Sequence, residues 1–241
     1  MKLCRLDDPA KRDVCIKDSI QSLLPEIKNN PNFFIPMDPF FHENFNGFLK
    51  NTLIDGKFAV KNVKTLGMTN ALVKNVKSQF NGFGMKLELD LFFPKLSSTG
   101  LYKTNFLLSN VKILSKGQFN VTLFNVNNKW SLKGKLVNID GEQFMEIYDT
   151  DIEMDVGDAK VEFSGVFENQ ILSKCWNIFI YWKIILEISL SDDYLNSFIN
   201  RYWKLIYKDL IAETKNQWSP LVLDVVNKFF SAYPFKKLMV L

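Results

Sequence analysis

Residues 191–231 read SDDYLNSFINRYWKLIYKDLIAETKNQWSPLVLDVVNKFFS, and this stretch decides the fold. Its apolar residues recur every three to four positions, which predicts an amphipathic helix. Ser191 or Asp192 suits the N-cap position, and Asp193 suits the positive end of the helix dipole. The predicted apolar stripe contains Leu195, Phe198, Ile199, Tyr202, Ile206 and Leu210.

Pro220 interrupts this pattern because it lacks an N–H and clashes with the preceding turn. The apolar spacing nevertheless resumes beyond it and continues to Phe229. As one helix the stretch would be roughly 60 Å long, at 1.5 Å per residue. A globule of this chain length has a radius of gyration of only about 18 Å. We therefore expect the helix either to kink at Pro220 or to impose an elongated shape on the elements around it.

From about residue 53 to residue 163 the pattern changes to alternation of apolar and polar residues, which is typical of strands. The candidate strands are 57–65, 71–80, 85–93, 100–114, 119–124, 129–138, 143–156 and 159–167, with glycines between them. Short connections favour antiparallel pairing, and one apolar face means that the sheet covers something on that side. The sequence thus predicts an α+β fold in which a curved antiparallel sheet covers the C-terminal helix.

The N-terminal region predicts a short helix over 13–28, followed by a turn-rich connector over 29–39. His42 is the single histidine, and we expect it in a loop. Residues 172–190 are almost continuously apolar, but Lys183 and Glu187 argue against a membrane span. A buried strand or hairpin and an additional helical turn both remain compatible with this stretch.

Catalytic and metal-binding patterns are missing from the sequence. One histidine cannot build a nucleophilic site without partners, and no zinc spacing, P-loop or dinucleotide fingerprint occurs. Asp149-Thr150-Asp151 is not followed by the glycine and the distal glutamate that an EF-hand calcium loop requires. The net charge of +4 is mild, with the lysines spread out. We predict no enzyme, no metal, no cofactor and no nucleic-acid partner.

Three cysteines leave the redox state open on spacing alone. Cys4 and Cys15 are near neighbours, which suggests a disulfide and an oxidising compartment, while three reduced thiols are the alternative. Asn120-Val121-Thr122 is a glycosylation acceptor, so we expect Asn120 on the surface. No signal peptide is visible, so either a leader was removed or the protein is cytosolic.

A series of short motifs, in order, resembles the takeout and juvenile-hormone-binding protein family of insects, in the tubular lipid-binding superfamily. The motifs are Cys4 and Cys15, 23–28 (LLPEIK), 35–39 (IPMDP), 62–68 (NVKTLGM), 89–94 (LDLFFP), 100–102 (GLY), 117–121 (GQFNV), 161–167 (VEFSGVF), 196–207 and 233–235 (YPF). Together they cover nearly the whole chain. Asn105 and Ser115 stand where the family usually has glycine, and 172–190 looks inserted before the long helix.

The resemblance implies one domain over 1–241, with a strongly curved antiparallel sheet wrapped around the long helix. It also implies secretion, a disulfide between Cys4 and Cys15, and an internal tunnel for a hydrophobic ligand. The state of Cys175 depends on whether 172–190 is a genuine insertion.

We therefore predict a monomeric, secreted carrier of a small hydrophobic ligand such as juvenile hormone, another terpenoid or a fatty acid. The predicted lining residues are Leu87, Leu89, Leu91, Phe119, Val121 and Phe144 from the sheet, and Phe198, Tyr202 and Ile206 from the helix. The Tyr202 hydroxyl is a candidate partner for a ligand head group. The alternatives are a ligand-free interaction protein and a membrane-associated lipid-transfer module tethered by 172–190, although we do not expect membrane contact.

Overall fold

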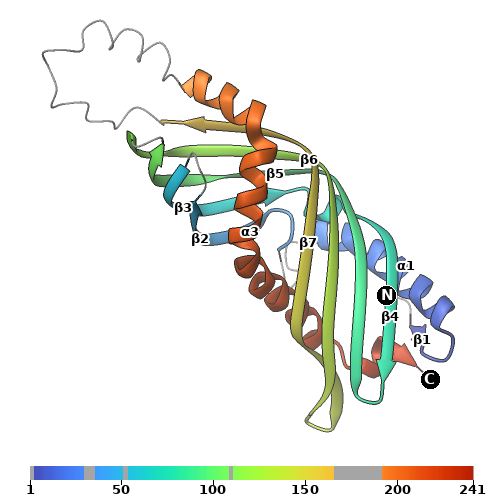
Figure 1. Ribbon diagram of the computed structural model, residues 1–241. Helices are drawn as coiled ribbons and strands as arrows, with labels where there is room; N and C mark the ends of the chain where they lie inside the picture. Colours follow the sequence, from blue (N-terminus) through green and yellow to red (C-terminus); the bar gives the residue numbers. More distant parts are fainter. Residues whose placement is uncertain (1–2, 30–35, 51–53, 109–110, 166–191, 241) are drawn as a thin grey trace, which may run out of the picture.

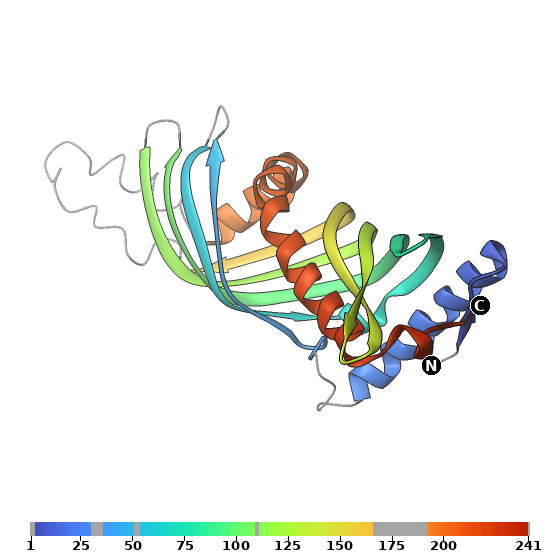
Figure 2. The same ribbon diagram turned by 90° about the horizontal axis from the view of Figure 1, so that it is seen from below.

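The computed structural model describes residues 3–29, 36–50, 54–108, 111–165 and 192–240. A strongly curved antiparallel sheet wraps around one long helix, α3 (Asp192–Ala232), as the sequence predicts (Figures 1 and 2). The predicted insertion 172–190, with Cys175, lies outside the described residues.

The sheet has six strands, and five of them follow the order β2-β3-β5-β6-β7. Their bounds are β2 (Phe40–Lys50), β3 (Ile54–Leu66), β4 (Leu72–Asn81), β5 (Gly84–Leu108), β6 (Val111–Ile139) and β7 (Glu142–Ser164). β5 is long enough to pair with β4 along its first part and with β3 along its second. Short elements complete the fold: β1 (Cys4–Arg5) pairs with β8 (Met239–Val240), and η1 (Met68–Asn70) and η2 (Phe235–Lys237) are single 3₁₀ turns.

Several predicted strand ends are wrong because glycine does not always mark a turn here. Gly82 and Gly141 do lie in hairpin turns at positive φ. Gly100, Gly117 and Gly157 instead lie inside β5, β6 and β7. A Cβ on Gly117 would lie 1.8 Å from the Ser164 carbonyl oxygen, so close approach of two strands requires this glycine.

Two further corrections concern the ends of the sheet. The predicted strand 100–114 runs across the connection between β5 and β6, at 109–110. His42 lies in β2, paired with Val63, and not in a loop as predicted. β2 was missed because His42, Asn44 and Asn46 conceal the apolar alternation of Phe45 and Leu49.

α3 remains helical through Pro220 and contains 41 residues. Its axis changes direction between its orange first part and its red second part, so the helix follows the curve of the sheet (Figure 2). This outcome combines the two expectations for this stretch, a bend and an elongated shape, since Pro220 removes one helical hydrogen bond without ending the helix.

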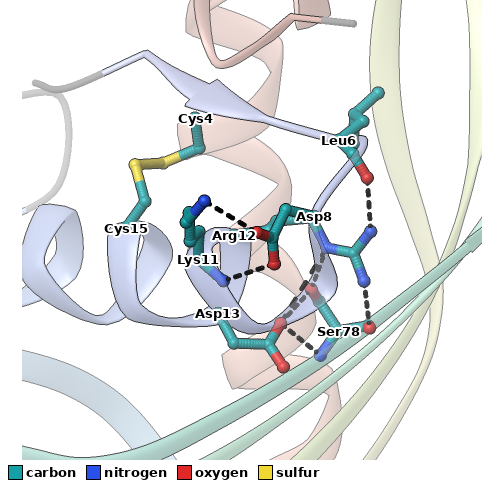
Figure 3. A network of polar contacts seen from close by, with 8 residues as sticks. All are labelled: Cys4, Leu6, Asp8, Lys11, Arg12, Asp13, Cys15 and Ser78. Atoms are coloured by element: carbon teal, nitrogen blue, oxygen red, sulfur yellow. Dashed lines mark hydrogen bonds and ion pairs between the residues drawn. A yellow bond between two sulfur atoms is a disulfide. The ribbon is translucent and has the colours of Figure 1, made fainter.

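The N-terminal helix α1 (Pro9–Asn29) packs against β4 and is fastened there by a buried polar network (Figure 3). Arg12 is 7% exposed and donates to the Ser78 side chain (2.7 Å), the Ser78 carbonyl (2.7 Å) and the Leu6 carbonyl (2.9 Å). Asp13 accepts from the Ser78 amide at 3.0 Å. The Cys4–Cys15 disulfide joins the chain before α1 to the helix itself, as the resemblance implied.

The interior divides into two groups of apolar residues. The larger group, here the proximal core, is built from α1, β4, the first part of β5, the later part of β6, the earlier part of β7 and most of α3. Leu132, Ile147 and Val126 are its most buried large side chains. The smaller group centres on Tyr102 and Phe119. It lies in the half of the sheet that contains β2, β3, the second part of β5 and the first part of β6. We call this half the distal half.

Candidate functional site

α3 is attached to the edge of β7 by asparagine side chains that imitate a neighbouring strand. Each side-chain amide accepts from the N–H and donates to the C=O of one β7 residue, at 2.7–2.9 Å. The three pairs are Asn196 with Phe163, Asn200 with Val161, and Asn227 with Ile147. An unpaired edge strand is exposed to pairing with other chains, so these contacts close that edge.

The opposite edge of the sheet meets the same helix. The Gln217 side chain accepts from the Asn46 amide (3.3 Å) and donates to the Asn46 carbonyl in β2. The Trp218 and Phe45 rings lie 5.6 Å apart between centroids beside this contact. Thr150 of β7 donates to the Ser219 carbonyl at 3.1 Å. At this level α3 therefore bridges β2 and β7, and helix and sheet together form a closed ring.

The concave face of the distal half is rich in aromatic side chains. Tyr102 and Phe119 are buried and pack with Val60, Val63, Val121 and Phe163. The rings of Tyr102 and Phe163 meet edge to face, with centroids 5.0 Å apart. Among the described side chains this group includes none from α3, whereas the proximal core contains Trp203, Tyr207 and Val226 of that helix.

One polar pair lies within this aromatic surface. The hydroxyl groups of Tyr102 and Ser115 are 2.9 Å apart and buried, and Tyr102 also donates to the Ser164 carbonyl at 3.3 Å. Such a pair can orient the polar end of a mostly apolar molecule, because apolar walls alone fix no orientation.

The structure separates the predicted lining residues into different environments. Leu87, Leu89 and Leu91 belong to the proximal core. Phe119 and Val121 lie on the distal concave face. Phe144 alternates with buried Met145 and so faces the other side of β7.

The helical candidates are also divided. Tyr202 is 43% exposed, and its ring lies beside the Arg201 guanidinium at 5.6 Å, whereas Ile206 is partly buried. The Phe198 side chain lies outside the described residues. Sequence reasoning did not select Tyr102, Ser115 or Phe163. Their shared face follows from strand register, and alternation within one strand does not reveal register.

Two hollows lie on the outer, convex face of the sheet. The first, of about 310 Å³, is bordered mainly by Asn75, Lys77, Glu88, Asp90, Lys129 and Asp151. The second, of about 480 Å³, is bordered by residues that include Thr99, Leu101, Gln118, Asn120 and Glu162. The first hollow is mainly polar and so lacks the surroundings that an apolar ligand requires. The second is of mixed character, because Gly100, Phe119 and Phe163 also border it.

In the described part of the chain, the titratable groups form no metal-binding cluster, and one tyrosine has a shifted pKa. No group of three or more histidine, cysteine or acidic residues there could hold a metal ion. Burial, with a smaller contribution from Asp155, raises the pKa of Tyr207 to about 12. Its hydroxyl donates to the Met154 carbonyl at 3.0 Å, which is a structural contact between α3 and β7. No helix in the described ranges is long and apolar enough to cross a membrane.

The fold is that of a curved sheet closed by one long helix, which is bonded to both edges of the sheet. Residues 1–190 and 189–240 match the profile of the haemolymph juvenile hormone binding protein family, and the chain belongs to this family. No curated protein shows a significant match to the chain.

Among solved structures, the chain is similar to Takeout 1 of Epiphyas postvittana, with a TM-score of 0.75 and 18% identity over 100% of both chains. That likeness establishes the fold. A lipopolysaccharide binding protein aligns with 78% of this chain and 38% of its own, at 15% identity and a TM-score of 0.32, which is too low to support an argument.

Proposed function

We propose that this protein is a secreted, monomeric, single-domain carrier that holds a small hydrophobic ligand between α3 and the concave face of the distal half. A terpenoid such as juvenile hormone and a fatty acid are the two ligand classes in view. The observation that carries the proposal is the aromatic face around Tyr102 and Phe119. None of the described side chains of α3 belongs to this apolar cluster. Membership of the family supports it independently.

The mechanism is transfer of apolar surface out of water, with no bond made or broken. Burial of roughly 400 Å² of ligand at about 25 cal/mol per Å² contributes about 10 kcal/mol before the cost of association is subtracted. Micromolar or tighter binding follows from this balance. The Tyr102 and Ser115 hydroxyls supply the polar contact that orients the ligand.

The test is uptake of a fluorescent fatty acid by the purified protein, with solvent extraction and mass spectrometry to detect lipid that copurifies. Val121→Phe narrows the concave face and should lower the affinity roughly tenfold, because an added ring displaces ligand volume. Gln118→Phe is the matched control, since Gln118 is exposed on the opposite face of β6. Absence of both bound lipid and uptake would instead support a ligand-free interaction protein.

The predicted glycosylation acceptor Asn120 is partly buried on the outer face of β6, where its side-chain amide donates to Glu162 at 3.2 Å. Glycosylation of this residue stays a prediction.

A further inference from the structure

The outer face of the distal half carries lysines and leucines in adjacent positions. The strand register places Lys57 opposite Asn105 and Asn105 opposite Leu114, Lys103 opposite Lys116, and Lys61 opposite Leu101. Paired residues share a face of a sheet, and these alternate with the inward-facing Val60 and Tyr102, so their side chains lie on the convex side. We call Lys57, Lys61, Leu101, Lys103, Leu114 and Lys116 the basic patch. All six are exposed, Leu101 by 45% and Leu114 by 46%.

Acidic residues in the described part of the chain do not pair with the lysines of the basic patch. Within the described residues none of its four lysines forms an ion pair, and Asp55 and Glu162 are the nearest acids on this face by register. Glu162 already pairs with Lys160 at 2.7 Å. The proximal half of the same outer face differs, since three of its lysines are paired: Lys86 with Glu88 (2.6 Å), Lys133 with Asp149 (2.8 Å) and Lys135 with Glu146 (3.2 Å).

We propose that the basic patch docks onto the surface of a membrane that contains anionic phospholipids. Lysine ammonium groups are attracted to such a surface, and this attraction weakens over about 10 Å at 0.1 M salt. Leu101 and Leu114 lie among the four lysines, where they can enter the boundary between head groups and acyl chains.

The composition of the patch favours lipid over other anionic partners. Its cations are all lysines, with no arginine to bind phosphate or carboxylate in a bidentate manner. Two exposed leucines contribute little against a nucleic-acid backbone, but they contribute directly to binding at a lipid interface.

The position of the patch connects docking to the interior. β3, β5 and β6 present the basic patch on one face and Val60, Tyr102 and Phe119 on the other. A docked protein would thus hold its distal concave face one strand layer away from the membrane. Docking itself does not depend on the proposed ligand, whereas its use in loading or delivery rests on the carrier function.

The experiment is flotation of the full chain with vesicles of phosphatidylcholine alone and with vesicles that also contain phosphatidylserine. The wild type should float only with the phosphatidylserine vesicles, and binding should fall as salt rises. Replacement of Lys57, Lys61, Lys103 and Lys116 by glutamine should lower the partition at least about tenfold. The matched control replaces Lys77, Lys129, Lys133 and Lys135, which changes the net charge equally, and should retain binding.

Leu101→Ser with Leu114→Ser keeps every charge and should weaken the binding that survives at high salt. Equal loss in the patch and control variants would overturn the proposal, because net charge alone would then explain it. Equal binding to both kinds of vesicle would overturn it too, as would retention on immobilised polyglutamate without flotation, which would assign the patch to an acidic protein. Fatty acid uptake by the patch variant separates the docking proposal from the carrier proposal, since loss of docking should leave the affinity for the fatty acid unchanged.

Discussion

The proximal and distal halves of the molecule are built from the same strands but are completed differently. In the proximal half the concave face is filled by α1 and α3, and charges on the convex face form ion pairs. In the distal half the concave face presents aromatic rings, and the lysines of the basic patch form no ion pair with any residue that the structure describes. β5 and β6 run through both halves with the same alternation of inward and outward side chains. The two halves therefore differ in the helices and charges that contact each face of the sheet, and not in the strand pattern.

The helices explain this division. α1 packs against β4 and also contacts η1 and β1, with Arg12 and Asp13 bound to Ser78, and it contributes to the proximal core. α3 runs along β7 through both halves, and its amide side chains hold it at the edge of that strand. In the proximal half α3 also contributes Trp203, Tyr207 and Val226 to the core, whereas none of its described side chains belongs to the distal aromatic group.

The largest expected effect is a difference in stability between the halves. Leu132→Ala, in the proximal core, should lower the free energy of unfolding by about 2–5 kcal/mol, because it leaves a cavity among packed neighbours. Val121→Ala, on the distal face, should cost only about 1 kcal/mol, because Val121 is partly buried and removes less apolar surface from water. Urea denaturation measures both values. Equal losses of unfolding free energy in the two variants would contradict the difference between the proximal and distal halves.

An intermediate effect is expected at the asparagine contacts with β7. Asn227→Ala and Asn200→Ala each leave a β7 N–H and C=O without a partner and should cost about 1–3 kcal/mol. Ile147 is 1% exposed, so loss of its contact with Asn227 should cost more than loss of the contact between Asn200 and Val161. Hydrogen exchange at the two amides reports each contact separately. Unchanged protection in both variants would contradict this role.

The smallest effect is a pH dependence at Tyr207. Its pKa is raised to about 12 in the folded protein, so the folded state binds this proton more tightly than the unfolded state, whose pKa is near 10. The contribution to stability is therefore complete below pH 10 and is lost as pH rises towards 12. Tyr207→Phe should remove this part of the alkaline decline. An identical decline in the wild type and the variant would show that other groups cause it.

The sequence was sufficient for the architecture because periods of two and of 3.6 are local properties of the chain. It misplaced strand ends, since Gly100 and Gly117 serve close approach between strands and not turns. Leu87 and Phe119 were grouped as lining residues, yet the structure puts them in separate clusters. That separation depends on where α1 docks, which is a long-range contact that alternation within a strand does not encode.

The central claim is that a hydrophobic ligand lies against the distal concave face while the proximal core is packed. A photoactivatable fatty acid, cross-linked to the protein and mapped by mass spectrometry, tests this most directly. We predict cross-links to the second part of β5 and the first part of β6, around Tyr102, Phe119 and Val121, with displacement by unlabelled fatty acid. Displaceable cross-links confined to the proximal core, around Leu87 and Leu132, or to the convex face would contradict the account.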